Sequence, residues 1–182
     1  MARIYRDGQL IEEHWQTIDT LEEGASLPAE GALMVSLELL LANVGFLENR
    51  SDQLIVKIEP DEDPHRLAPV LGNIAVVAVT FPTFADGRGF SIARILRDEL
   101  GFKGEIRAVG AYILDQMPFL CRCGVTSFEI SRPEILKGLQ EGNWPEVTRY
   151  LQPAAEDEQN PGIGRSWVRR SARVSRHMVR AD

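Results

Sequence analysis

The sequence has few of the features that assign a chemistry directly. Its two cysteines, Cys121 and Cys123, stand one residue apart, which excludes a disulfide framework and fits a reducing compartment. The longest apolar run, near Leu33–Val44, is interrupted by polar residues and is too short to span a bilayer. The N-terminus lacks the apolar segment of a signal peptide. We therefore expect a cytoplasmic protein without a membrane span.

Motifs for common cofactors and metals are missing as well. The glycines at 87 and 89 lack the third glycine of a dinucleotide fingerprint, because position 92 is Ile, and no Lys-Ser or Lys-Thr follows them as in a phosphate-binding loop. Two cysteines and three scattered histidines do not make a zinc site. We expect no cofactor and no metal, and we interpret Cys121 and Cys123 as buried, inert thiols.

What the sequence does contain is ordinary for a globular protein, except for its charge distribution. The 182 residues are 44 % hydrophobic and 26 % charged, enough for one domain with a real core. The net charge of −7 divides unevenly, because residues 161–182 hold six arginines and one acid. The acidic remainder argues against nucleic acid as a partner. The basic tail either screens the acidic body or binds an acidic partner surface, with nucleic acid or membrane as further alternatives.

The residue pattern predicts an α/β fold. Asp7-Gly8 between two short alternating runs predicts an N-terminal β-hairpin, and the apolar segment Met34–Ala42 suits a short buried helix. Four strand–helix units follow and imply a parallel sheet, either an open doubly wound sheet or half of an eight-stranded barrel. The strands are expected at 54–58, 74–81, 105–109 and 127–130, and the helices at 64–72, 89–100, 115–123 and 133–139. The chain then divides into a hairpin and lead-in (1–30), an α/β domain (31–152), and a linker with an arginine-rich tail (153–182).

Helix-start signals and loop positions point to one side of this sheet. Asp63 and Asp115 can cap the helices that follow them, and Ser131 and Glu134 have the spacing of a capping box. Functional loops of parallel sheets lie at the carboxyl ends of the strands. That rule selects three loops, Pro82–Gly89, Gly110–Gln116 and Ser131–Arg132.

The first of these loops suggests a small anion site. Arg88 stands between Gly87 and Gly89, where the backbone can approach a ligand closely and the amides of a helix start favour negative charge. The alternative is a structural turn in which Asp86 caps the helix and forms an ion pair with Arg88. In the second loop, Asp115 and Gln116 face the same side. Asp86 and Asp115 are the candidates for acid–base catalysis.

The motifs together resemble a known family. The run Phe81–Arg97, which reads F-x-x-F-A-D-G-R-G-F-S-x-A-R-x-L-R, is followed by Gly104–Gly110, by Asp115-Gln116 and by Arg122-Cys-Gly. This combination resembles the bacterial domain of unknown function numbered 934, over roughly 33–140. The resemblance adds Arg107 and Arg122 to the candidate site residues. The other characteristic residues are Asp86, Gly87, Arg88, Gly89, Arg97, Asp115, Gln116, Cys123 and Gly124.

Members of that family are often encoded beside sulfite reductase and other sulfate-assimilation genes, so the resemblance implies a role in sulfite reduction. Three hypotheses follow. The protein is an accessory or partner of sulfite reductase or of another sulfate-assimilation protein, with a small-oxyanion site. Alternatively, it is a small enzyme of the same pathway acting on a sulfur oxyanion, with Arg88 orienting the substrate. Third, it is a binding or regulatory protein unrelated to sulfur.

Overall fold

The computed structural model describes residues 2–21, 27–28, 30–45, 50, 52–145, 149–150 and 170–171. Eight strands form one sheet, in the order β2-β1-β8-β7-β6-β5-β4-β3. They are β1 (Ala2–Arg6), β2 (Gln9–Glu13), β3 (Gln16–Ile18), β4 (Leu33–Ser36), β5 (Leu54–Ile58), β6 (Val76–Phe81), β7 (Glu105–Gly110) and β8 (Ser127–Glu129). The α-helices are α1 (Leu37–Ala42), α2 (Arg88–Arg94), α3 (Met117–Arg122) and α4 (Pro133–Gln140). Short 3₁₀ helices cover Pro64–Leu67, Leu71–Asn73 and Leu114–Gln116, and a π-helical turn covers Ile95–Glu99.

The sheet is mixed, with the strand order of half a barrel. Strands β3 to β8 are parallel, and each pairs with the next in the chain. The predicted hairpin is confirmed, and its β1 pairs antiparallel with both β2 and β8. The α/β half-barrel is therefore confirmed, whereas the prediction of a purely parallel sheet is wrong. The reason is that the hairpin adds its two strands to the edge left open by β8.

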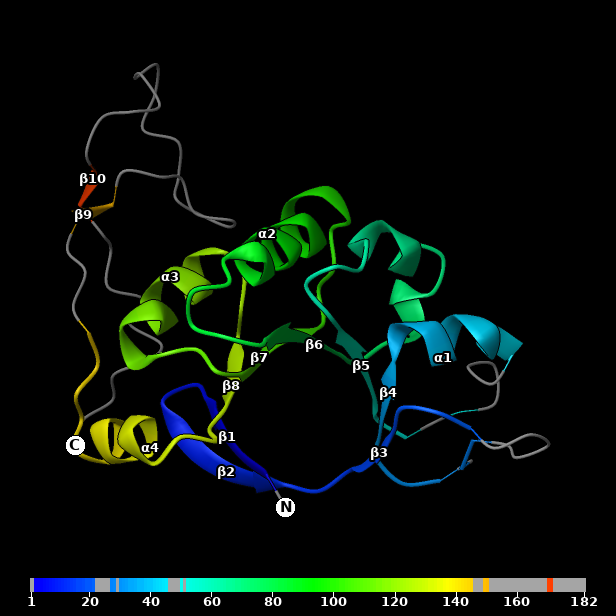
Figure 1. Ribbon diagram of the computed structural model, residues 1–182, viewed down its shortest axis with the longest axis horizontal. Helices are drawn as coiled ribbons and strands as arrows, with labels where there is room; N and C mark the ends of the chain where they lie inside the picture. Colours follow the sequence, from blue (N-terminus) through cyan, green and yellow to red (C-terminus); the bar gives the residue numbers. More distant parts are fainter. Residues whose placement is uncertain are drawn as a thin grey trace.

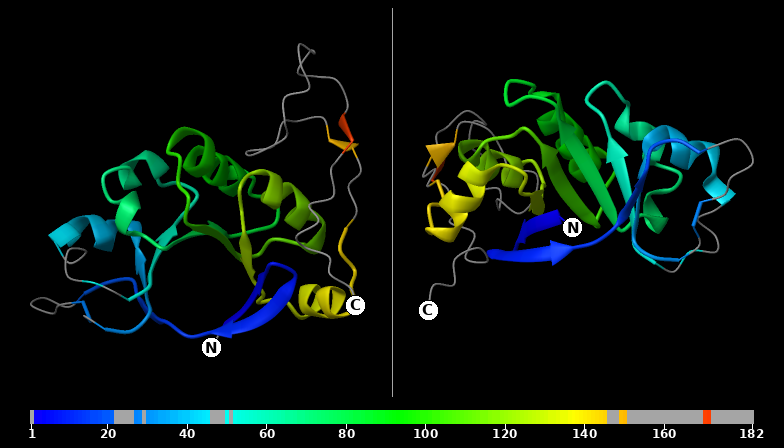
Figure 2. Two further views of the ribbon diagram at one scale, coloured as in Figure 1. Left: turned by 180° about the vertical axis from the view of Figure 1, so that it is seen from behind. Right: turned by 60° about the horizontal axis from the view of Figure 1, so that its bottom comes forward.

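The sheet curls strongly, with the helices on its outer side. Figure 1 shows α1, α2 and α3 outside the curved sheet, with α4 beside the hairpin. The two ends of the strand order come close together in the views of Figure 2, because β2 runs into β3 through His14 and Trp15 alone. A connection of two residues between the first and last strands of the order holds the sheet in its curved form.

Successive side chains of each strand point to opposite faces of the sheet, and both faces are apolar. Outward-facing residues such as Val56, Val79 and Phe81 join the main core under the helices. The inner face carries a smaller cluster against which Trp15 packs. Its members are Met34, Ile55, Val76, Ala78 and Val109. Strands buried on both faces explain the nearly continuous apolar run before Phe81.

The predicted helix at Met34–Ala42 is wrong in its first three residues. Residues up to Ser36 form β4, which pairs with β3 on one side and with β5 on the other. The helix begins after Ser36, whose Oγ accepts a hydrogen bond of 3.3 Å from the amide of Leu39. A short apolar run has no period that separates a buried strand from a buried helix, and here it contains both.

Three helix-start predictions have different outcomes. Asp63 does cap its helix by accepting from the amide of His65 at 3.0 Å, although that helix is 3₁₀. The capping box is wrong, since Arg132 occupies the N-cap of α4 without a side-chain hydrogen bond. Ser131 instead directs its hydroxyl to the carbonyl of Gly110, at 3.4 Å. Asp115 is not a cap either, because it lies inside the turn Leu114–Gln116.

The linker and tail predicted at 153–182 lie outside the described residues, apart from β10 (Arg170–Ser171). This strand pairs antiparallel with β9 (Arg149–Tyr150) in a separate two-stranded sheet. At the other end of the chain, the strands of the lead-in belong to the same sheet as those of the α/β domain. Within the described residues, no helix has the length and apolar character needed to cross a membrane.

Candidate functional site

The three loops at the carboxyl ends of β6, β7 and β8 lie next to one another. Gln116 joins the first two, because its Nε2 donates to the carbonyl of Phe84 at 2.7 Å and its Oε1 accepts from the amide of Ile113 at 3.1 Å. The hydroxyl of Ser131 links the third loop to Gly110. Gln116, a predicted site residue, thus braces the loops from within.

Arg88 and Asp86 form a tight unit in the first loop. Arg88 donates to Asp86 from its backbone amide at 3.1 Å and from two guanidinium nitrogens, Nε at 3.0 Å and Nη2 at 2.7 Å. These hydrogen bonds hold the pKa of Asp86 below its ordinary value. The Arg88 side chain remains 59 % exposed, against 16 % for Asp86. An oxyanion that binds Arg88 must therefore share the guanidinium with this carboxylate.

The two glycines beside Arg88 have different surroundings. A Cβ on Gly89 would stand 2.5 Å from two ring carbons of Phe81, so the close packing of α2 on β6 requires glycine there. Gly87 is exposed at the N-cap of α2 and has no heavy atom within 4 Å of a Cβ position. Nothing in the structure explains glycine at position 87.

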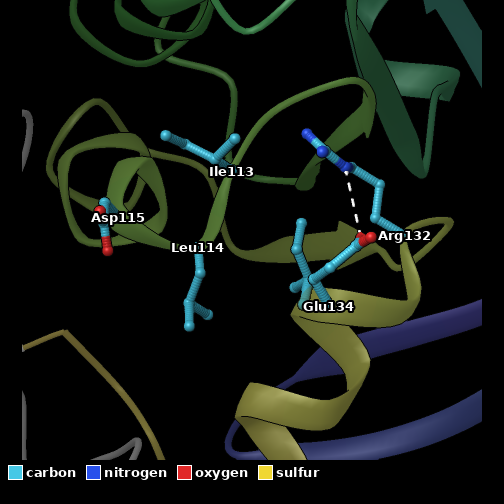
Figure 3. Close-up of a pocket in the computed structure, with 6 residues that line it drawn as sticks. Ile113, Leu114, Asp115, Arg132 and Glu134 are labelled. Atoms are coloured by element: carbon cyan, nitrogen blue, oxygen red, sulfur yellow. Dashed lines mark ion pairs between the residues drawn. The ribbon is translucent and has the colours of Figure 1, made fainter.

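A small pocket opens between the second and third loops. It has a volume of about 260 Å³ and is lined by Ile113, Leu114, Asp115, Arg132, Glu134 and Ile135. Figure 3 shows the charged groups of Asp115 and Arg132 on either side of Ile113 and Leu114. Reasoning from the sequence found Asp115 but assigned no role to the Arg132 side chain. Its position in the short loop between β8 and α4, at the carboxyl edge of the sheet, was the signal that could have singled it out.

Arg107 lies away from these loops, on the inner face of the sheet. Its side chain is fully buried. It forms ion pairs with Glu105 at 2.6 Å and with Glu13 at 2.8 Å, and its guanidinium lies over the ring of Trp15 at 5.1 Å. Arg6 completes this cluster through Glu105 at 2.7 Å and Glu13 at 3.2 Å. We call Arg6, Glu13, Glu105 and Arg107 the interior charge cluster.

Arg122 and the cysteines lie at the far end of α3. Arg122 is half-buried in the last turn, on the side where β8 begins. The helix carries the chain away from the carboxyl edge, so neither Arg122 nor Cys123 approaches the three loops.

Arg97, another family-characteristic residue, is buried and donates to the carbonyls of Gly124 at 2.9 Å and Gly104 at 2.8 Å. These contacts give Arg97 a structural role.

We expect both thiols to react slowly. Burial raises the pKa of Cys121 to about 12 and also raises the pKa of Cys123. At pH 8, Cys121 would then be thiolate in only about one molecule in ten thousand. Alkylation by iodoacetamide should be at least about a hundredfold slower in the folded protein than in urea. Equal rates in both conditions would contradict this prediction.

The described residues contain no group of three or more His, Cys, Asp or Glu side chains that could hold a metal ion. The arrangement that most resembles a metal site surrounds His65. Its Nδ1 lies 2.8 Å from an oxygen of Asp63, and its Nε2 lies 3.0 Å from an oxygen of Glu99. Hydrogen bonds that the His65 ring donates to these two carboxylates raise the pKa of His65 above its ordinary value. His65 thus ties the turn after β5 to the π-helical turn.

Comparison with known proteins gives one match. The profile of a family described as bacterial protein of unknown function, DUF934, matches residues 55–161. Because the match covers more than half of the chain, the protein belongs to this family. No curated protein and no solved structure matches the sequence significantly.

Proposed function

We propose that this member of the DUF934 family is an accessory protein of assimilatory sulfite reduction that binds sulfite reductase or another sulfate-assimilation protein. The observation that carries the proposal is an exposed aromatic residue and an exposed arginine in the same loop. Phe84 is 59 % exposed, and Arg88 is exposed to the same extent. The resemblance described above supports the identity of the partner.

Both side chains belong to a loop that hydrogen bonds within the chain hold in place. The Gln116 amide holds the backbone at Phe84, and the Asp86 carboxylate holds the guanidinium of Arg88. Aromatic residues and arginine carry much of the binding energy in protein interfaces. A loop fixed in advance loses little conformational entropy on binding. Arg88 can then contact either a carboxylate of the partner or a small oxyanion bound between the two proteins.

The loop chemistry favours an accessory protein over an enzyme that uses Asp86. A general acid at neutral pH needs a pKa close to 7. The hydrogen bonds from Arg88 shift the pKa of Asp86 in the opposite direction. Asp86 is therefore suited to holding Arg88 in place rather than to donating a proton.

The binding test uses purified protein and purified sulfite reductase in titration calorimetry. Phe84→Ala and Arg88→Ala are each expected to weaken binding at least about tenfold. Val44→Ala and Arg66→Ala are matched controls, because Val44 is an exposed apolar residue elsewhere and Arg66 is an exposed arginine paired with Glu38. Undiminished binding by both loop variants would exclude this surface.

Growth separates the sulfur hypotheses from a function unrelated to sulfur. A deletion strain without a redundant copy is expected to grow on cysteine but poorly on sulfate. The wild-type gene should restore growth on sulfate, and Arg88→Ala should not. Normal growth of the deletion strain on sulfate would refute both the accessory and the enzyme hypotheses.

A further inference from the structure

The pocket between the second and third loops has a chemistry of its own. Its apolar wall consists of Ile113, Leu114 and Ile135, and its charged groups are Asp115, Arg132 and Glu134. It opens where β7 and β8 end, the edge of a parallel sheet at which ligands commonly bind. The volume of about 260 Å³ lies just below the range of drug-sized sites. The pocket therefore suits a ligand with few non-hydrogen atoms.

The polar groups of this pocket are open to new partners. Within the described part of the chain, Arg132 has one ion-pair partner, since its Nε lies 3.7 Å from Glu134 Oε2. That separation exceeds hydrogen-bond length, so the donors of the guanidinium remain available. Asp115 is exposed, and its carboxylate accepts no hydrogen bond from the described residues. Glu134 extends from the first turn of α4 with its side chain 76 % exposed.

We infer that this pocket binds a small zwitterion, namely a free α-amino acid with a short aliphatic side chain. Its carboxylate would be held by Arg132, whose planar guanidinium matches a carboxylate in two hydrogen bonds. Its ammonium group would be held by Glu134, whose Oε2 lies 3.7 Å from Arg132 Nε, so the two charged groups of one α-carbon can reach both side chains. Its side chain would lie against Ile113, Leu114 and Ile135.

The charge of the pocket distinguishes this ligand from the alternatives. Two carboxylates and one guanidinium leave a net charge of −1 among the lining residues. A bare oxyanion would be repelled by the two carboxylates, and a purely apolar ligand would leave Arg132 without a new partner. A zwitterion satisfies both signs of charge at once. This inference goes beyond the proposed function and does not depend on it.

Calorimetry with L-valine tests the inference on the full-length protein. L-valine should bind saturably, whereas N-acetyl-L-valine and L-valinamide should each bind at least about tenfold more weakly. The first analogue lacks the ammonium group and the second lacks the carboxylate. Saturable binding is expected below about 10 mM, and its absence up to that concentration overturns the inference.

Variants then assign the contacts. Arg132→Gln and Glu134→Gln should each weaken L-valine binding at least about tenfold, with thermal unfolding confirming that each variant is folded. Lys137→Gln is the matched control, because Lys137 also lies on α4, is 77 % exposed and does not line the pocket. Unchanged affinity in Arg132→Gln, or equal affinity for valine and valinamide, would refute the site.

Discussion

Replacing Arg107 with alanine is expected to lower the free energy of unfolding by about 3–5 kcal/mol. The guanidinium is fully buried and pairs with two carboxylates, Glu105 and Glu13. Without it, both carboxylates would stay in a largely buried region, and among the described residues Arg6 alone would pair with them. An uncompensated buried charge costs far more than a pair of exposed charges contributes.

Urea unfolding at neutral pH measures this loss, and Arg66→Ala serves as the control. Arg66 also pairs with a carboxylate, that of Glu38, but both side chains are well exposed. Water screens such a pair, so the control should unfold at nearly the same urea concentration as the wild type. If Arg107→Ala behaved like Arg66→Ala, the interior charge cluster would contribute little to stability.

The same cluster predicts how stability depends on pH. Burial by itself would raise the pKa of Glu105, but hydrogen bonds and charge from Ser127, Arg107 and Arg6 outweigh burial, and the pKa lies below its ordinary value. A depressed folded-state pKa stabilises the protein above the unfolded-state pKa of about 4.3. This contribution is lost as the pH falls through the folded-state pKa. The wild type should therefore lose stability in acid, and Arg107→Ala should lose less over that range.

Replacing Gly110 with alanine is expected to cost about 3 kcal/mol or more. Gly110 ends β7 with φ at +102°, a region that residues with a Cβ rarely adopt. Its Cβ would also stand 2.4 Å from the carbonyl oxygen of Phe81. That oxygen belongs to the backbone and accepts a hydrogen bond from Ala111, so it cannot turn aside as a flexible side chain could.

The control for this variant is Gly72→Ala. Gly72 is exposed and has no heavy atom within 4 Å of a Cβ position, so alanine there should change stability by less than about 1 kcal/mol. Chemical denaturation of both variants under the same conditions makes the comparison. A small effect at Gly110 would mean that β6 and β7 separate easily at their carboxyl ends.

Local signals in the sequence were enough to predict much of the fold. The turn sequence Asp7-Gly8 was sufficient to predict the hairpin, and Asp7 has the positive φ of 52° that such a turn needs. The strands at 54–58 and 105–109 could be predicted because each is a short, largely apolar run that ends at a charged residue or at glycine. The capping box failed because Ser131 has an acceptor in another loop, which local spacing cannot reveal.

The candidate site was less predictable, because its contacts join distant parts of the chain. Arg107 was singled out by resemblance, yet Glu13, which pairs with it, comes from the N-terminal hairpin. The side chain of Gln116 contacts the carbonyl of Phe84 in another loop, a relation that no spacing rule contains. The Arg88 and Asp86 pair, only two residues apart, was foreseen as the structural alternative to an anion site.

The antiparallel pairing of β1 with β8 has a consequence for synthesis of the chain. The hairpin leaves the ribosome well before β8, so Ile4 must wait for Glu129 before its ladder with β8 can form. Until then, β1 exposes one unpaired edge to other chains, the kind of edge on which strands aggregate. Slow pairing of distant segments should dominate the folding time. The protein is therefore most vulnerable to misassembly before β8 has been translated.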